Sequence, residues 1–233
     1  MHRFTAPGPF TSGSLLTLDK TQSHHLTKVL RLEEGAELLV IDGVGHVARA
    51  KVADAHAKAS TVKIGSVDVH KPHSATVLCF AVPKGQALDF LIRRTTELGV
   101  AAFQPLQTKF SSPIKGWNAQ RWESVVAEVC KQCEDPFFPK VLPPRTLLDW
   151  LASREPARPL VLCDEHDRAS RIETARGGAD LVIGAEGGFS EEESKLLRNS
   201  GAVLMGLGRN RLRAETAALV ALTLLKQKTG EMG

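Results

Sequence analysis

The stretch Leu181-Val182-Ile183-Gly184-Ala185-Glu186-Gly187-Gly188-Phe189-Ser190 decides the fold of the larger part of this chain. Its apolar beginning is typical of a short strand that is buried on both faces, as in a parallel sheet. Ser190, followed by Glu193, forms the capping-box pattern that begins a helix. Ligands bind at the carboxyl ends of strands in α/β sheets, and glycines there let the backbone approach a ligand closely. The stretch therefore predicts a ligand-binding loop or, alternatively, a plain tight turn, and it lacks the Gly-Lys-Ser/Thr of a P-loop.

The segments around this stretch continue the alternation of strands and helices. Strands are predicted at Thr76–Val82, Val100–Phe103, Leu160–Cys163 and Ala202–Leu207, and helices at residues 88–98, 118–133 and 214–226. Gly99 and Gly201 are predicted to end the helices that precede them. This alternation is typical of α/β proteins with a parallel sheet covered by helices on both faces.

The last predicted helix has no polar face between Ala217 and Leu225. A helix that is apolar all round is buried. Two places can bury it: an interface between subunits, or the space beneath a neighbouring helix of the same chain.

The first 70 residues or so have a different pattern. Short strands are predicted at Leu15–Leu18, Glu37–Ile41, His46–Ala53 and Thr61–Val69. Asp42-Gly43 between two apolar runs predicts a hairpin. One helix interrupts the strands, with Leu26, Val29 and Leu30 on one face and Gly35 as its stop. A β-rich module of this size is typical of a small barrel, and the polar linker at residues 70–74 divides the chain into domains 1–72 and 73–233.

Composition narrows the class of protein without naming a function. The chain has 233 residues, 42% of them hydrophobic and 24% charged, and a formal net charge of +4. These values are typical of a globular protein and leave an acidic partner possible. No apolar run is long enough for a transmembrane helix, and the start has no hydrophobic secretory segment. Its 4 cysteines are expected to be reduced thiols, so we expect a cytoplasmic protein.

A second glycine-bearing loop follows the strand predicted at Ala202–Leu207. Gly206-Leu207-Gly208-Arg209-Asn210-Arg211 begins like a dinucleotide fingerprint, but Arg211 stands where the last glycine belongs. Too little chain follows for the βαβ unit that this fingerprint requires. Arg209, Arg211 and Arg213 are therefore predicted either to bind phosphates bidentately or to form local ion pairs with Glu215.

Other motifs give no support for a metal site or for serine hydrolysis. Cys130 and Cys133 have C-x-x-C spacing, but no second cysteine pair with this spacing completes a zinc site. The pair also ends a helix, whereas a thioredoxin-type motif begins one, so we interpret it as core packing. No metal is predicted, and no Gly-x-Ser-x-Gly motif is present.

Taken together and in order, these segments resemble the bacterial 16S rRNA uridine-N3 methyltransferases, a family of the knotted (SPOUT) methyltransferases. The motifs that carry the resemblance are His25-Leu26-Thr27-Lys28-Val29-Leu30-Arg31, Asp42-Gly43, Pro83-Lys84-Gly85, Thr96-Glu97-Leu98-Gly99-Val100, Ile183-Gly184-Ala185-Glu186-Gly187-Gly188-Phe189, and Leu207-Gly208 with Leu212-Arg213-Ala214-Glu215-Thr216-Ala217. The resemblance implies a PUA-like β-barrel followed by an α/β domain with a trefoil knot. It also implies a homodimer formed through the C-terminal domain, and S-adenosyl methionine (SAM) as the methyl donor.

The resemblance also implies a set of site residues. The cofactor would lie against Leu162, Cys163, Ile183, Gly184, Glu186, Gly187, Gly188, Leu207, Gly208, Leu212, Arg213 and Thr216. Backbone groups of these loops can bind adenine, which would explain why no ribose-binding acid follows a dinucleotide fingerprint. The RNA of the small ribosomal subunit would contact Arg3, His25, Lys28, Arg31, Lys84 and Arg94, although each of these cations could instead be an ordinary surface charge.

The implied chemistry is methyl transfer to a uridine N3 that has lost its proton. Arg213 is the first candidate to stabilise the developing anion, and Arg211 is the second. Glu215 is predicted either to act as the general base or to hold Arg213 in place. Because N3 lies on the Watson–Crick edge, the target base has to be unpaired or flipped out.

The chain departs from the family pattern at two places. Ala185 stands where the family usually has proline. The run Gln132-Cys133-Glu134-Asp135 stands where the family usually has Gln, Ser or Cys, Gly and Arg, so Asp135 lies where an arginine is expected. Arg121 and Lys131 are candidate substitutes for that arginine. Two alternative functions follow: another SPOUT methyltransferase, acting on tRNA or on the ribose 2′-OH, or an RNA-binding module without activity.

Overall fold

The computed structural model describes residues 1–163 and 177–231, which form two compact units. The first unit comprises Met1–Pro72 together with Ala127–Phe138, and the second comprises His73–Val126 together with Pro139–Gly233. The domains 1–72 and 73–233 remain a prediction, to which the structure adds that Ala127–Phe138 groups with the first unit. Each unit is described by itself below.

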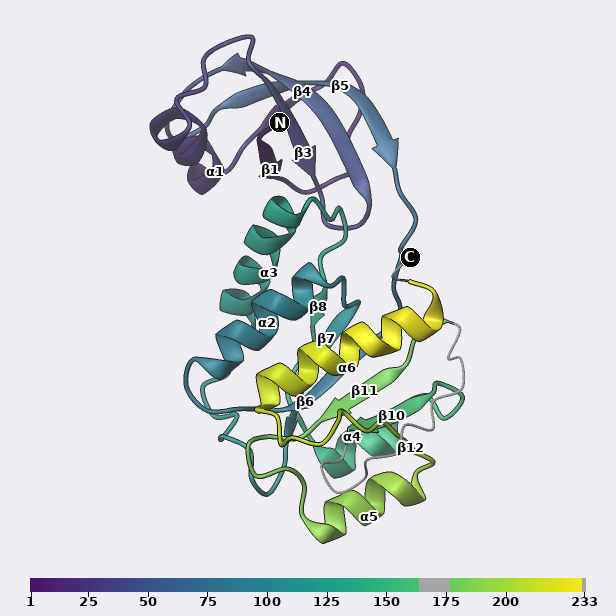
Figure 1. The fold of residues 1–233 in the computed structure, drawn as a ribbon. Helices are drawn as coiled ribbons and strands as arrows, with labels where there is room; N and C mark the ends of the chain where they lie inside the picture. The colour runs from purple at the N-terminus through teal and green to yellow at the C-terminus, as the bar shows by residue number, and fades with distance from the viewer. Residues whose placement is uncertain (164–176, 232–233) are drawn as a thin grey trace. The chain divides into compact units, whose positions relative to one another are not determined.

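A curled sheet of short strands forms the first unit (Figure 1). Its strand order is β1-β3-β4-β5-β2, with β1 parallel to β3 and the other pairs antiparallel. The strands are β1 (Arg3–Thr5), β2 (Leu15–Thr17), β3 (Glu37–Ile41), β4 (His46–Asp54) and β5 (Thr61–Val69). Alternate residues of β3, β4 and β5 enter one core, around Phe4, Leu38, Ala48 and Ile64. The four strands predicted for this region are confirmed, and β1 is an addition.

The Asp42-Gly43 hairpin between β3 and β4 is confirmed. Asp42 Oδ1 accepts hydrogen bonds from the backbone N–H groups of Val44 and His46, at 2.9 and 3.1 Å. Its Oδ2 lies 2.5 Å from Nδ1 of His46. Gly43 and Gly45 have φ values of +80° and +108°, which favour glycine. A short side chain that accepts from nearby backbone groups thus shapes the turn.

The helix of the first unit differs from the prediction. Asp19 caps α1 (Lys20–His24), and the chain continues as a π-helical turn, η1 (His25–Val29), in which the N–H of Leu30 donates to the carbonyl of His25. The wider turn rotates Val29 away from the core, so that it is 59% exposed, whereas Leu26 is buried. The predicted apolar stripe is therefore wrong at Val29. Gly35 is also not the stop, because η1 ends at Val29.

The second unit is built on a parallel sheet, as predicted. In the described residues its strand order is β12-β10-β11-β6-β7-β8, and β9 also pairs with β7. The strands are β6 (Val77–Ala81), β7 (Ala102–Gln107), β8 (Lys140–Val141), β9 (Arg145–Thr146), β10 (Leu160–Cys163), β11 (Asp180–Ile183) and β12 (Val203–Leu204). β7 starts later than predicted and β12 is shorter. β8 and β9 were not predicted, because a two-residue strand has no readable pattern.

Helices cover both faces of this sheet (Figure 1). They are α2 (Ala87–Glu97), α4 (Leu147–Ser153), α5 (Glu191–Asn199) and α6 (Ala214–Thr229). Helix α3 (Ala119–Cys133) is divided between the two units, because its residues from Ala127 onward group with the first. α2 packs along α6, which lies on β11. On the other face, Leu147 and Trp150 of α4 and Leu197 of α5 form a core with Leu162 and Val182. The helices α2, α3, α5 and α6 are confirmed, and α4 was missed because seven residues are too few to show a helical stripe.

Helix α6 is buried on one side only within the chain. Ala218, Ala221, Leu222 and Leu225 are buried, whereas residues 219, 220, 223 and 224 are partly exposed. The described residues therefore do not bury α6 all round. The trefoil knot that the family resemblance implies remains a prediction.

A buried lysine joins α6 to the end of α2. Lys226 is 3% exposed, and its Nζ donates to the carbonyls of Leu98 and Gly99 at 2.6 and 3.1 Å. These carbonyls lie at the end of α2, where Gly99 adopts a φ of +71°. The ends of helices leave carbonyls without an intrahelical partner, and a cation there also complements the helix dipole. Lys226 thus caps one helix from another.

We predict that Lys226→Met destabilises the second unit by about 2 kcal/mol or more, because two carbonyls lose their donor. Trp117, Trp122 and Trp150 all lie in this unit, so urea unfolding followed by tryptophan fluorescence measures its stability. Lys195→Met, at an exposed position of α5, is the control and should cost less than about 0.5 kcal/mol. Equal stability of the two variants would contradict the capping role.

Candidate active site

The described loops that follow β6, β7, β11 and β12 leave the sheet at one edge. Parallel register places Cys163 beside Ile183, and Ile183 beside Phe80. The loops comprise residues 82–86, 108–118, 184–190 and 205–213. The carboxyl edge of a parallel sheet is where α/β proteins bind ligands. This edge contains the stretch from which the sequence predicted a ligand-binding loop.

The loop after β11 is tight and depends on glycine. The N–H of Gly188 donates to the carbonyl of Ala185 at 2.9 Å, and Gly188 has a φ of +68°. A β-carbon on Gly184 would lie 3.0 Å from the backbone of Gly188. The capping box that follows is confirmed: Ser190 accepts from the N–H of Glu193, and the Glu193 carboxylate accepts from the N–H of Ser190. A compact loop of backbone groups therefore precedes the N-terminus of α5.

Glu186 joins this loop to two others. Its carboxylate Oε1 accepts from the backbone N–H of Lys84 at 2.9 Å, in the loop after β6. Its carbonyl accepts from the guanidinium of Arg211 at 3.0 Å, in the loop after β12. The sequence predicted Glu186 as a cofactor contact and Arg211 as a catalytic candidate. Those roles remain predictions; what the structure shows is that both residues join loops of this edge.

The loop after β7 joins the same cluster, which the sequence did not predict. Glu193 Oε1 accepts from the backbone N–H of Lys109 at 2.8 Å, so this one carboxylate serves both the capping box and the neighbouring loop. The ring of Phe110 lies against Gly187. These contacts connect positions far apart in the chain, and no local pattern signals them.

The other predicted cofactor residues lie on the same group of strand ends and loops. Leu162 and Cys163 end β10, and the carbonyl of Leu162 accepts from the N–H of Met205 at 2.9 Å. Burial raises the pKa of the Cys163 thiol, which keeps it neutral. Leu207, Gly208 and Leu212 lie in the loop after β12, where Gly208 has a φ of +106°, and Thr216 lies in the first turn of α6.

Arg213 and Glu215 lie at the start of α6. Arg213 is exposed at the N-cap position, and Glu215 is partly buried in the first turn. In the described part of the chain no ion pair joins the two side chains. No ion pair between the side chains of Glu215 and Arg213 therefore supports the alternative in which Glu215 holds Arg213 in place.

The predicted RNA-contacting residues of the first unit differ in their exposure to solvent and in their pairing with acidic side chains. Arg3 binds Glu134 at 2.6 Å, and this guanidinium lowers the pKa of the Glu134 carboxyl. His25 is partly buried, and burial is the main reason that its pKa is lowered. Lys28 and Arg31 are exposed. Asp135, at the position where the family pattern has arginine, accepts from the N–H of Phe137 at 2.9 Å, and the preceding Glu134 binds Arg3.

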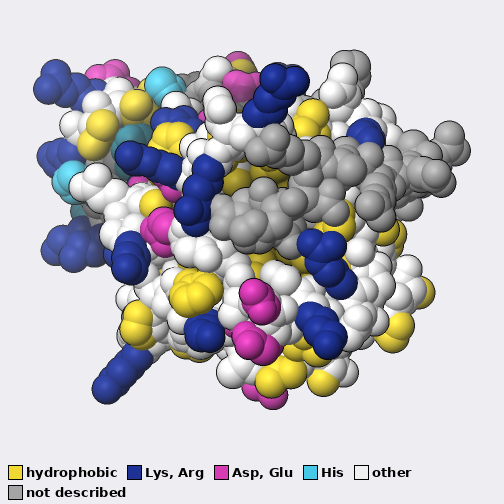
Figure 2. Space-filling model, turned by 60° about the horizontal axis from the view of Figure 1, so that its bottom comes forward, with side chains coloured by type: hydrophobic (Ala, Val, Ile, Leu, Met, Phe, Trp, Pro, Cys, Tyr) yellow, Lys and Arg dark blue, Asp and Glu magenta, His cyan; other side chains and the backbone are white. Residues whose placement is uncertain are grey.

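In the second unit, Lys84 is exposed next to Glu186, and Arg94 is paired with Glu97 at 2.6 Å. The Arg94 guanidinium also lies 5.8 Å from the ring centroid of Phe90. Of the candidate substitutes for the missing arginine, Arg121 lies 4.6 Å over the ring of Trp122, and burial lowers the pKa of Lys131. On the face drawn in Figure 2, Lys and Arg side chains predominate over acidic ones.

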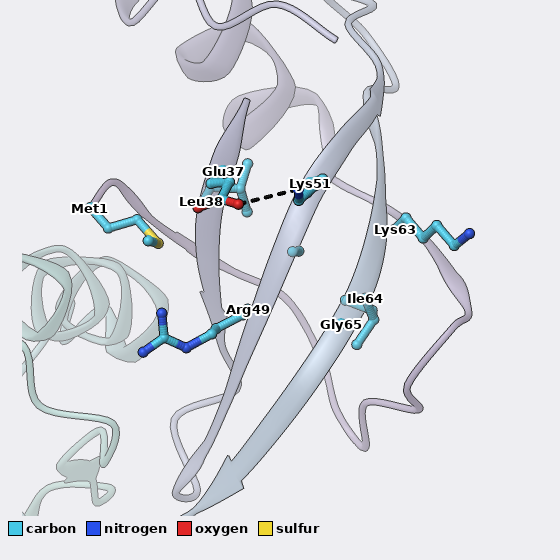
Figure 3. Close-up of a pocket in the computed structure, with 9 residues that line it drawn as sticks. Met1, Glu37, Leu38, Arg49, Lys51, Lys63, Ile64 and Gly65 are labelled. Carbon is cyan, nitrogen blue, oxygen red and sulfur yellow. Dashed lines mark ion pairs between the residues drawn. The ribbon is translucent and has the colours of Figure 1, made fainter. Parts of the chain in front are cut away.

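A cavity of about 370 Å³ on the sheet of the first unit adds cations that the sequence analysis did not single out. Figure 3 shows Arg49 extending on the side where Met1 lies, and Lys63 extending to the other side. Lys51, directly opposite Lys63 in the register, is paired with Glu37 at 3.2 Å. Arg49 and Lys63 are both exposed, so the sheet of the first unit presents positive charge.

The C-x-x-C pair and the membrane prediction can also be compared with the structure. Cys130 is buried and donates to the carbonyl of Phe137, but Cys133 is exposed, so the packing interpretation is wrong for Cys133. The neighbouring Cys130 side chain is the largest cause of the lowered pKa of Cys133, which is about 7. Within residues 1–163 and 177–231, no helix could cross a membrane, and no cluster of three or more His, Cys, Asp or Glu side chains could hold a metal ion.

The fold and these loops define an α/β protein with a candidate ligand site at the carboxyl edge of a parallel sheet, and the same chain contains a small β module with exposed cations. The comparisons with known proteins identify the family. Residues 70–226 match the RNA methyltransferase domain, and residues 18–65 match the RNA methyltransferase PUA domain. The chain therefore belongs to this family of RNA methyltransferases.

Relatives along the whole chain support this assignment. The chain is 34% identical over 221 residues to Ribosomal RNA small subunit methyltransferase E of Synechocystis sp., a match that covers 89% of this chain and 71% of the relative. A Legionella pneumophila protein described as a methyltransferase, solved with its bound cofactor SAM, has a TM-score of 0.86 at 28% identity and covers 97% of this chain and 96% of that one. Ribosomal RNA small subunit methyltransferase E of Neisseria gonorrhoeae, with 24% identity, coverage of 97% of each chain and a TM-score of 0.91, shows the same fold.

We predict that Glu186→Ala loosens the loop after β6, because the N–H of Lys84 loses its carboxylate acceptor. A hydrogen bond to a charged group contributes roughly 1.5 kcal/mol, so amide exchange at Lys84 should become about tenfold faster. Hydrogen–deuterium exchange of the peptide containing Lys84 measures this. Glu155→Ala, at an exposed position, is the control. Unchanged exchange in Glu186→Ala would contradict the role of Glu186 in joining these loops.

Proposed function

We propose that this protein transfers the methyl group of SAM to N3 of a specific uridine in the 16S rRNA of the small ribosomal subunit. The observation that carries the proposal is the 34% identity to a ribosomal RNA small subunit methyltransferase E over 89% of this chain. The family match over residues 70–226 supports the same reaction class. With a substrate of this kind, we expect the protein to act in the cytoplasm.

The loops at the sheet edge suit SAM as a cofactor. Close backbone packing at Gly184 and positive φ at Gly188 and Gly208 leave the site lined by backbone groups, which can bind adenine and ribose without a dedicated acid. The residues that would hold SAM are Leu162, Cys163, Ile183, Gly184, Glu186, Gly187, Gly188, Leu207, Gly208, Leu212, Arg213 and Thr216. When bound, SAM supplies a methyl group on a positively charged sulfonium. The two bonds of Glu186 keep the surrounding loops in place.

The chain supplies groups for the proton and for the charge. Methylation forms a bond from N3 to the methyl carbon, breaks the sulfur–methyl bond and releases the N3 proton. Arg213, which is exposed at the start of α6, is the proposed donor that stabilises negative charge on the uracil oxygens. Glu215, in the first turn of the same helix, is the candidate acceptor of the proton. Much of the acceleration would come from the alignment of the two reactants.

We also propose that exposed cations of both units contact RNA phosphates. Lys28 and Arg31 on the N-terminal module are exposed, as is Lys84 beside Glu186. Arg49 and Lys63 extend this charge over the sheet of the first unit. Phosphate contacts of this kind provide affinity and orientation, whereas the choice of base depends on the site.

A homodimer formed through the C-terminal domain is part of the proposal. Leu219, Val220 and Leu224 are apolar and only partly buried on one side of α6. A second copy of the chain that packs on this side would bury it, as the apolar pattern of the helix predicts.

Nucleoside analysis of methylated RNA tests the function directly. We predict that purified protein with SAM adds N3-methyluridine to small-subunit RNA prepared from a strain that lacks the gene. Methylation of tRNA or of a ribose 2′-OH would replace the substrate assignment. SAM binding without methylation of any RNA, or no SAM binding by calorimetry, would instead indicate the inactive RNA-binding module.

We predict that Arg213→Ala lowers the single-turnover rate by about 10²- to 10³-fold, the size expected when a donor to a developing anion is lost. RNA affinity and unfolding stability should change little, because Arg213 is exposed. Lys195→Ala on α5 is the matched control and should retain full activity. Full activity of Arg213→Ala would end this assignment.

A further inference from the structure

Phe110 is an exposed aromatic side chain at the edge of the candidate active site. It is 42% exposed, and among the described residues Phe90, at 44%, is the other exposed aromatic. Leaving a phenylalanine in water instead of burying it forgoes roughly 1.5–3 kcal/mol. A ring that remains exposed beside a site is therefore a candidate for ligand contact.

The ring lies directly on the glycine loop. A β-carbon on Gly187 would lie 3.0 Å from Cβ and 3.1 Å from Cγ of Phe110, closer than ordinary contact allows. Gly187 belongs to the loop after β11, whose neighbour Glu186 binds the loops after β6 and β12. Phe110 thus contacts the segment proposed to hold the cofactor, while much of its ring remains open to solvent.

The backbone around Phe110 is held on both sides. Before it, the N–H of Lys109 donates to the Glu193 carboxylate at 2.8 Å. After it, the N–H of Ser112 donates to the carbonyl of Val82 at 2.8 Å. Because Glu193 and Val82 belong to different elements of the same edge, these bonds fix the position from which the ring projects.

A cation accompanies the ring. Lys109 Nζ lies 5.8 Å from the centroid of Phe110. Proteins that bind single-stranded nucleic acid combine aromatic rings, on which bases stack, with cations that contact the phosphates. Phe110 and Lys109 provide one of each on adjacent residues.

We propose that the target uracil, once flipped out of the RNA, stacks on the ring of Phe110 while Lys109 contacts a neighbouring phosphate. This inference rests on the proposed function. Stacking holds a base by its face, so the edge that carries N3 remains free in the plane of the base. Phe110 is then a positioning residue for the base, next to the loop that binds the cofactor.

Three substitutions separate stacking from apolar packing: Phe110→Trp, Phe110→Leu and Phe110→Ala. Loss of one stacked base corresponds to a fall of about five- to 150-fold in kcat/KM for the RNA. We expect this loss in both the Leu and the Ala variants, because leucine keeps apolar bulk but has no π face. The Trp variant should remain within about threefold of wild type. The dissociation constant for SAM, measured by calorimetry, should stay unchanged in all three.

Phe90→Ala is the matched control, since it removes an equally exposed phenylalanine from α2. It should leave kcat/KM and SAM binding unchanged. Circular dichroism and light scattering of each variant confirm the fold and the state of association.

Several results would overturn the stacking role. Full activity of Phe110→Leu would show that Phe110 only packs against the loop. Weaker SAM binding by Phe110→Ala would show that Phe110 contacts the cofactor. A change in the molar mass of a variant in solution, measured by light scattering, would show that Phe110 lies in a subunit interface. Failure of the proposed function is distinguishable, because wild-type protein would then methylate no small-subunit RNA. If wild-type protein is active and Phe110→Ala is equally active, the stacking role is refuted while the proposed function stands.

Discussion

The candidate site depends on the two hydrogen bonds of Glu186. Its carboxylate binds the N–H of Lys84, and its carbonyl binds the guanidinium of Arg211, so one residue joins three loops. These loops have little regular structure of their own, and the strand ends alone do not fix where their tips lie. Cross-loop bonds therefore determine whether the glycine backbone can present a preformed surface. Glu193 extends the same arrangement to the loop that contains Phe110.

The sheet makes this arrangement possible. Because β6, β7, β10, β11 and β12 are parallel, their carboxyl ends all lie at one edge, and the described loops after β6, β7, β11 and β12 start from that edge. The strands are buried and apolar, so a shift in their register would move apolar side chains out of the core. Capping interactions then fix the helices around the sheet, through Ser190 and Glu193 at α5 and through Lys226 at α2. Stability and site geometry thus rest on the same strand ends.

The positions where local patterns were wrong have identifiable causes. A helical period of 3.6 residues placed Val29 in the core, but the π-helical turn changes that period and exposes it. The C-x-x-C pair was interpreted as packing, yet only Cys130 is buried, because α3 ends at Cys133. Helix α6 is apolar over most of its surface, yet among the described residues it is buried on one side, so its apolar pattern alone did not indicate what covers the other side.

The sequence by itself determined the parallel α/β class, most strand and helix positions, the Asp42-Gly43 hairpin, the Ser190 capping box and the loops that contain the predicted site. These features follow from patterns between residues that are close along the chain. Only the tertiary structure decided that Arg211 binds the carbonyl of Glu186, that Lys226 caps α2 and that Phe110 lies against Gly187. Such contacts join distant segments, and they form only when the parallel sheet brings its carboxyl ends to one edge.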